Sequence, residues 1–205
     1  SYLREHLAHT VYDAIGSYSC ITFPMRTHRN GAFYGVDTFI EQIDETYLER
    51  HGMDADGALY KMYNSLSDPV IKSLPRYDSD NDKKTRLFED YSDIAELVAG
   101  VDPSLEDRSV YLFDNIDIPG MLTYLAGHIL IQDLDHDAHN YYMYRDSEGN
   151  GEWIALPHDR DFCLGVGTTA DDDPGSHPFF GCDDYRWPRW VELPDNDNQD
   201  WNRLT

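Results

Sequence analysis

Two groups of polar residues with the spacing of a phosphoryl-transfer site lie on either side of a short predicted hairpin. Asp135 and Asn140 stand in a D-x-x-x-x-N pattern, and Asp159 follows after two apolar segments. One carboxylate of such a set can orient an acceptor hydroxyl, while amide and carboxylate oxygens hold Mg²⁺ against nucleotide phosphates. The pattern therefore predicts a site for Mg²⁺-assisted phosphoryl transfer.

The elements that must position these residues follow from periodicity. Apolar residues at helical spacing predict a helix from Ile118 to Ile129, with Pro119 accommodated in its first turn. Residues 141–144 and 153–156 are short apolar segments separated by a polar turn at residues 146–151, which predicts a hairpin. The two polar groups therefore flank one hairpin.

The N-terminal part of the chain predicts a helix followed by a second hairpin. Leu3, Leu7, Val11 and Ile15 mark one helical face, and Gly16 is typical of the residue that ends a helix. Asn-Gly between two strand-like segments favours a type I′ turn. The expected elements that complete this part are strands at 19–27, 32–40 and 58–62, a helix at 44–51, a surface excursion at 64–88 and a helix at 91–98.

Composition limits the classes of function. A chain of 205 residues that is 40% hydrophobic can bury a core, as one domain or two small lobes. The net charge of -23 argues against nucleic acid as a partner and favours basic substrates or divalent cations. The acidity itself fits either a solvated surface or a set of cation sites. No apolar run is long enough to span a membrane.

Weaker patterns remain open beside the main one. Residues 78–89 imitate the spacing of a calcium loop, but Lys83 replaces the turn glycine. His136 and His139 have a spacing that suits zinc, without a third marked ligand. Asp133 is expected to be solvated. Three cysteines allow at most one internal disulfide, and the nearest pair in sequence is Cys163 with Cys182.

Four ordered segments carry a family resemblance. Residues 33–44, 57–61, 139–144 and 153–159 resemble the successive motifs of the CotH kinase family, the spore-coat protein H type, in order and in spacing. The resemblance implies an α+β, atypical protein-kinase-like fold. The chain would hold mostly the C-terminal lobe, with an N-terminal helix and hairpin. Residues 1–62 would form the helix, hairpin and hinge portion, and residues 63–205 the catalytic lobe.

The resemblance also implies an activity and its residues. The family is expected to transfer the γ-phosphate of ATP, with Mg²⁺ or Mn²⁺, to Ser or Thr of a protein substrate, in spore coats or on extracellular surfaces. Ca²⁺ is an alternative metal, indicated by the acidic spacing at residues 78–89 and at Asp133, Asp135 and Asp137 and not by the resemblance. The residues carried over by motif are Asp135 as the catalytic Asp, Asn140, Asp159 and Asp161 as metal ligands, and Lys61, Glu41 and Asp44 as nucleotide contacts.

This chain departs from the family pattern in two ways. A kinase of this type has a strand lysine and a phosphate-covering loop upstream of its first helix, and no glycine-rich phosphate loop occurs here. The N-terminal strands are therefore expected to be missing, as in a fragment of a longer protein. His158 stands where the family usually has Trp. A kinase-like surface or adhesion module without turnover, and an acidic cation-binding extracellular structural protein, remain alternatives.

Overall fold

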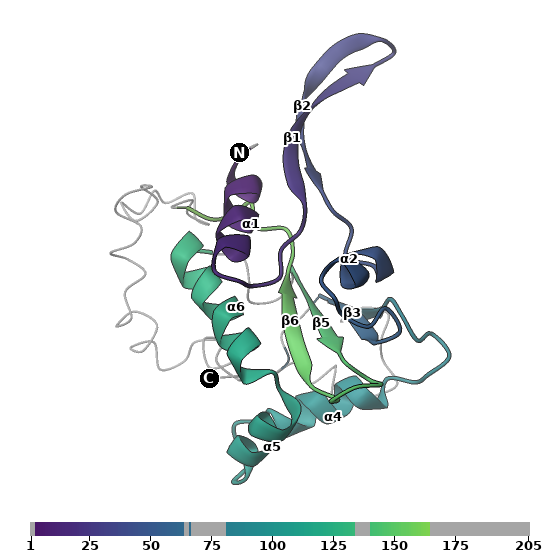
Figure 1. The fold of residues 1–205 in the computed structure, drawn as a ribbon, viewed down its shortest axis with the longest axis vertical. Coiled ribbons are helices and arrows are strands. Elements are labelled where there is room, and N and C mark those ends of the chain that lie inside the picture. The colour runs from purple at the N-terminus through teal and green to yellow at the C-terminus, as the bar shows by residue number, and fades with distance from the viewer. Residues whose placement is uncertain (1–2, 64–65, 67–80, 134–139, 165–205) are drawn as a thin grey trace.

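The computed structural model describes residues 3–63, 66, 81–133 and 140–164. These residues form a mixed α+β fold with antiparallel sheets, which confirms the predicted fold class at this level (Figure 1). In chain order the elements are α1 (Arg4–Ala14), β1 (Thr22–Arg29), β2 (Ala32–Ile40), α2 (Glu45–Arg50), β3 (Ala58–Met62), β4 (Asn81–Lys83), α4 (Ser92–Gly100), α5 (Arg108–Asn115), α6 (Ile118–Ile131), β5 (Tyr141–Arg145) and β6 (Trp153–Pro157).

The central sheet has four strands in the order β4-β3-β5-β6, all antiparallel to their neighbours. Its two inner strands are rich in aromatic and apolar side chains, and almost all of them are buried. Helix α6 packs beside β6, and α1 packs against α6 (Figure 1). The predicted hairpin of β5 and β6 is confirmed, with its aromatic residues in the core.

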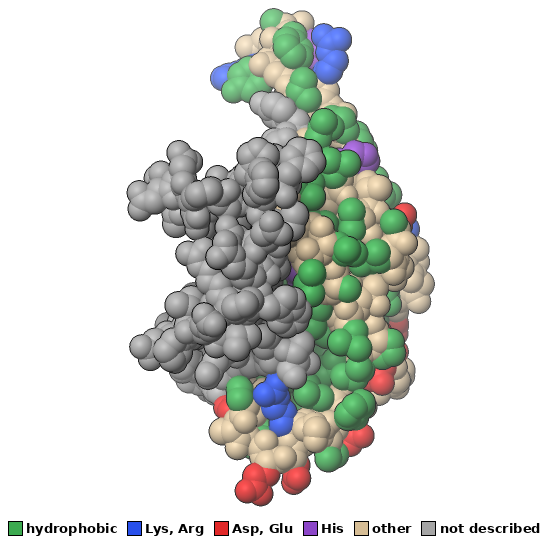
Figure 2. Space-filling view, turned by 90° about the vertical axis from the view of Figure 1, so that its left-hand side faces the viewer, with side chains coloured by type: hydrophobic (Ala, Val, Ile, Leu, Met, Phe, Trp, Pro, Cys, Tyr) green, Lys and Arg blue, Asp and Glu red, His purple; other side chains and the backbone are tan. Residues whose placement is uncertain are grey.

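The second sheet is the hairpin of β1 and β2, which projects from the rest of the protein (Figure 1). Asn30 and Gly31 adopt φ values of 53° and 81°, so the predicted type I′ turn is confirmed. The rings of Phe23 and Phe39 stack across the strands with centroids 4.6 Å apart, although both side chains are exposed. Figure 2 shows hydrophobic side chains gathered on this projecting part, with basic ones beside them.

Helix α1 forms where it was predicted, but its predicted buried face is wrong. Leu3 and Leu7 are about half exposed, at 55% and 48%. The buried residues are Glu5, Ala8, His9 and Tyr12. Burial of this polar pair is favoured because Glu5 Oε1 lies 3.0 Å from His9 Nε2, so these two atoms satisfy each other.

Helix α6 shows the same kind of difference. Its position and its first-turn proline agree with the prediction, and Asp117 caps its start by accepting from the Gly120 N–H at 3.0 Å. Leu122 and Ile129, expected in the core, are exposed. The helix instead buries Met121, Tyr124, Gly127, His128 and Ile131.

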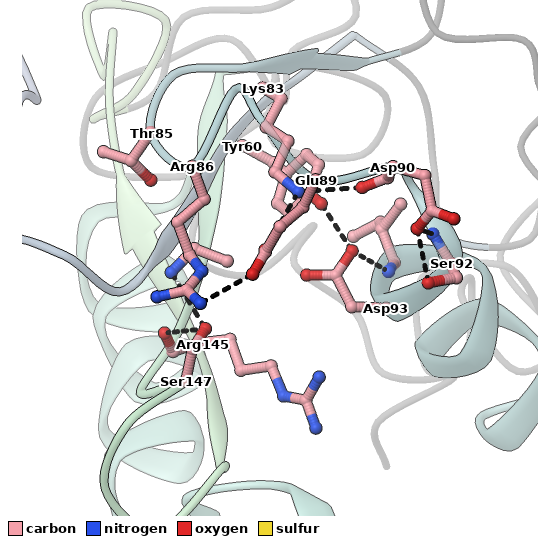
Figure 3. A network of polar contacts seen from close by, with 12 residues as sticks. Tyr60, Lys83, Thr85, Arg86, Glu89, Asp90, Ser92, Asp93, Arg145 and Ser147 are labelled. Carbon is pink, nitrogen blue, oxygen red and sulfur yellow. Dashed lines mark hydrogen bonds and ion pairs between the residues drawn. The ribbon is translucent and has the colours of Figure 1, made fainter.

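Residues 81–93 are joined to the core by polar contacts (Figure 3). The Lys83 ammonium is buried, donates to the carbonyl oxygen of Asp90 at 2.8 Å and lies over the rings of Tyr60 and Tyr91. Arg86 pairs with Glu89 and with Glu148 of the β5–β6 turn. Residues 64–88 were predicted to form a surface excursion. The prediction is wrong for residues 81–83, because they form β4 and extend the sheet.

Two further findings complete the fold. Helix α5 was not predicted; its short amphipathic segment buries no residue completely. Among the described residues, no helix has the length and apolar character needed to cross a membrane.

Candidate functional site

The sheet places Lys61 in a polar group at one end of β6. Lys61 of β3 lies directly opposite Tyr142 of β5, so both side chains project from the same face. Lys61 Nζ lies 4.9 Å from the centroid of the Tyr142 ring and 3.2 Å from Nδ1 of His158, the residue after β6. The imidazole packs edge-on against the same tyrosine. Lys61 is therefore a half-buried residue held in place, and not a free surface lysine.

Charges within this group favour a neutral histidine. Burial lowers the pKa of Lys61 to about 8, although the charge of Asp159 opposes the shift. Burial, followed by the positive charge of Lys61, lowers the pKa of His158 to about 3. Near pH 7 the ammonium therefore donates its hydrogen bond to an unprotonated Nδ1. This arrangement leaves a positive charge close to Asp159.

Asn140 and Asp159 are brought together by the hairpin that separates them in sequence. Asn140 immediately precedes β5, Asp159 follows β6 by one residue, and the His158 N–H donates to the Asn140 carbonyl oxygen at 3.1 Å. Both residues have left-handed backbones, with φ of 69° and 53°. Asn and Asp adopt this conformation more readily than other residues with a side chain, and such backbones are enriched at functional sites. Two of the predicted metal ligands thus lie on adjoining segments.

A buried ion pair lies directly behind these segments. Arg160 and Asp133 are 0% and 1% exposed, and the guanidinium NH1 donates to Asp133 Oδ2 at 2.6 Å. The second guanidinium nitrogen donates to the Tyr124 hydroxyl at 3.0 Å. The prediction that Asp133 is a solvated carboxylate is wrong, because it pairs with a cation distant in sequence.

Helix α1 contributes a second buried carboxylate near the site. The Cys20 N–H donates to His9 Nδ1 at 3.0 Å, so the proton of this imidazole is on Nε2 and points to Glu5 Oε1. Glu5 Oε2 is buried and has no hydrogen-bond partner among the described residues. The Cys20 thiol lies 3.8 Å from the carbonyl oxygen of Pro157 at the end of β6. Sequence reasoning missed Glu5 and His9; a charged and a polar residue one helical turn apart were the available signal.

Glu41 and Asp44 lie between β2 and α2 and are both engaged. Glu41 accepts from Nε of Arg50 at 2.9 Å and from the Ile21 N–H at 2.8 Å. Asp44 is the N-cap of α2 and accepts from the N–H groups of Thr46 and Tyr47. These contacts order the connection between β2 and α2. The nucleotide roles of Glu41 and Asp44 stay a prediction.

Other predicted residues are placed less fully. Asp135, His136, Asp137 and His139 lie outside the described residues, as does Cys182. Asp161 is exposed. Within the calcium-like segment, Asp82 and Glu89 are paired with lysine and arginine, and residues 78–80 are not described. Cys20 and Cys163 are buried free thiols.

The donor set of the site suits a hard cation better than a soft one. Asn140 and Asp159 offer amide and carboxylate oxygens, which Mg²⁺ accepts in small numbers because it keeps several waters and binds substrate phosphates. No three His, Cys, Asp or Glu residues of the described segments gather into a protein-only metal cage. The residues present therefore fit a metal that binds together with phosphate.

An ammonium beside hard oxygen donors defines a class of site suited to phosphates and divalent cations. The model of the family described as CotH kinase protein matches residues 1–203 of the chain. The protein belongs to the CotH kinase family, which confirms the resemblance seen in the motifs. A comparison with curated proteins finds no match.

Proposed function

We propose that this protein is an atypical protein kinase that transfers the γ-phosphate of ATP to Ser or Thr of a protein substrate with Mg²⁺ or Mn²⁺. Membership of the CotH kinase family supports a kinase-like function. The observation that carries the proposal is the hydrogen bond from His158 N–H to the Asn140 carbonyl, which joins the two segments bearing Asn140 and Asp159.

In the proposed reaction, Asp135 orients the acceptor hydroxyl and accepts its proton. The bond between the γ-phosphorus and its bridging oxygen breaks, ADP leaves, and the acceptor oxygen forms the new P–O bond. Asn140 and Asp159 are the ligands proposed for the metal, with Asp161 as an additional one. When bound, the metal neutralises charge on the phosphates. Asn140 and Asp159, both with left-handed backbones, lie next to the ends of β5 and β6.

Lys61 is proposed to contact a phosphate. Its ammonium is held by Tyr142 and His158, so little side-chain freedom remains to be lost when an anion binds. Glu41 and Asp44 are proposed to lie near the nucleotide, at a connection whose backbone they order through Arg50 and the start of α2. Ca²⁺ is the alternative metal for the same oxygen ligands.

The proposed fold assignment is the C-terminal lobe of a kinase-like protein together with α1 and the β1–β2 hairpin. Two observations support further strands that pack on this part. The hairpin leaves Phe23, Phe33 and Phe39 exposed. Glu5 on α1 keeps one buried carboxylate oxygen without a described partner, and kinases pair a helix glutamate with a strand lysine. An extracellular, cell-surface or spore-coat location is proposed from the family alone.

The proposal is tested by incubation of the protein with γ-labelled ATP, Mg²⁺ or Mn²⁺, and a panel of acidic and basic protein acceptors. The expected result is label on an acceptor, recovered as phosphoserine or phosphothreonine after hydrolysis. Absence of label on every acceptor and on the protein itself, with both metals, would contradict the proposal.

A kinase-like binding module without turnover is the second candidate, because the projecting hairpin exposes aromatic side chains that suit a protein partner (Figure 2). The two candidates differ in one outcome. A module would bind its partner without ATP and transfer no label, whereas a kinase transfers label.

A further inference from the structure

We propose that Asp133 and Arg160 are positioning residues. Their buried ion pair holds the segment that bears Asp159, and that is bonded to Asn140 through His158, against the end of α6 in the register needed to bind metal and nucleotide together. This inference rests on the proposed phosphoryl-transfer function. Neither residue is proposed to touch the substrate, because both side chains are fully buried. Their role is to fix the backbone position of the proposed metal ligands.

Three contacts hold residues 158–164 in place, two of them to the end of α6 and one to Asn140 before β5. The Leu164 N–H donates to the Ile131 carbonyl at 2.7 Å, Arg160 pairs with Asp133 at 2.6 Å, and the His158 N–H donates to the Asn140 carbonyl at 3.1 Å. Asp159 lies between the second and third of these contacts. Its left-handed backbone is therefore held from both sides, by His158 and by Arg160.

Stability alone does not explain why a charged pair is kept here. Removal of two charges from water costs about as much as their attraction returns, and an apolar pair of similar volume often packs as well or better. A pair of this kind can instead specify register, because only one alignment brings guanidinium and carboxylate together. Here that alignment sets the backbone of Asp159 relative to the end of α6.

The pair is also coupled to α1 through α6. His128 Nδ1 lies 3.0 Å from Asp133 Oδ2 and 3.1 Å from the Tyr12 hydroxyl. Arg160 is further fixed by Tyr124, whose hydroxyl accepts a hydrogen bond and whose ring lies 5.8 Å from the guanidinium carbon. The position of the metal ligands therefore depends on helices that lie on the other side of the ion pair.

The test uses binding of Mn²⁺ with a non-hydrolysable ATP analogue, measured by titration calorimetry, because this readout does not require turnover. In the double variant Asp133→Leu/Arg160→Met, the apolar pair replaces both charges. The expected result is a melting temperature within about 5 °C of the original protein. Metal–nucleotide affinity is expected to fall roughly tenfold or more, as it does when groups that orient metal ligands are removed. The matched control Arg86→Met removes two ion pairs, with Glu89 and Glu148, and leaves affinity unchanged.

A folded double variant with unchanged metal–nucleotide affinity would overturn the inference. If the double variant does not fold, Tyr124→Phe decides, because it removes only the hydroxyl that fixes Arg160. The expected result is then a fall in affinity of roughly threefold, and no change overturns the inference. A further outcome is that the original protein binds the metal and nucleotide, loses affinity in the variants of this pair, and yet transfers no label. That result would contradict the kinase proposal but not the positioning role.

Discussion

Lys61 Nζ lies 3.2 Å from His158 Nδ1. The lysine is on β3 and the histidine follows β6. The contact therefore crosses β5, the strand that lies between β3 and β6 in the sheet. An imidazole acceptor can aim the ammonium, which an indole cannot do because its only nitrogen is a donor. His158 thus gives Lys61 a defined direction.

Nucleotide binding should weaken as the pH rises through the pKa of Lys61. Burial lowers that pKa to about 8, so the ammonium is mostly charged at pH 7 and mostly neutral at pH 9. Because only the charged form attracts phosphate, affinity for an ATP analogue should fall by about tenfold over this range. Titration calorimetry with Lys61→Met provides the control, since its affinity should be lower at pH 7 and nearly independent of pH. A variant with the original pH dependence would contradict the phosphate role.

Replacement of His158 should affect nucleotide binding more than turnover. His158→Phe keeps the aromatic contact with Tyr142 but removes the acceptor for Lys61. KM for ATP should rise by roughly fivefold while kcat changes by less than about twofold. His158→Gln retains an acceptor and should recover most of the loss. Equal KM values in all three proteins would show that the contact does not aim Lys61.

Acid should destabilise the fold through His128. This imidazole is buried, and burial together with the charge of Arg160 lowers its pKa to about 4 despite the hydrogen bond to Asp133. The unfolded imidazole takes up a proton near pH 6.5, so stability is lost as the pH falls from there toward 4. Between pH 7 and 5 the loss from this group is about 2 kcal/mol. Urea unfolding of His128→Gln should show a smaller pH dependence; an unchanged slope would contradict this cause.

Gly127 permits the close contact between α6 and α1. A Cβ atom at this position would lie 2.1 Å from Cε1 of the buried Tyr12 ring. Gly127→Ala should therefore lower the free energy of unfolding by about 1–3 kcal/mol. Gly35→Ala on β2, where a Cβ meets nothing within 4 Å, is the matched control and should change it by less than about 1 kcal/mol. Equal stabilities in chemical unfolding would contradict the steric argument.

The elements with local signals were predictable from the sequence. The turn at Asn30 and Gly31 and the strands β2 and β3 follow from turn chemistry and apolar spacing, and the structure has them at the expected residues. Helix α5 and strand β4 were missed because both are short. Neither carries a period long enough to be distinguished from a loop.

The buried polar groups were not predictable in the same way. Patterns of apolar residues assign polar side chains to solvent, so the burial of Glu5 and His9 on α1 and of His128 on α6 was not predicted. Glu5 and His9 are buried because they bond each other, and Asp133 because its partner Arg160 lies 27 positions away. Such pairing depends on tertiary structure, and no local period reports it.

The most direct test of the central claim is transfer of label from γ-labelled ATP by Asp135→Ala and Asp159→Asn, each compared with the original protein. Asp114→Asn, an exposed position on α5, is the matched control. The account predicts that each of the first two variants loses roughly a hundredfold or more of the transfer rate, while each keeps its melting temperature and the control keeps its rate. Transfer at the original rate in both Asp135→Ala and Asp159→Asn would contradict it.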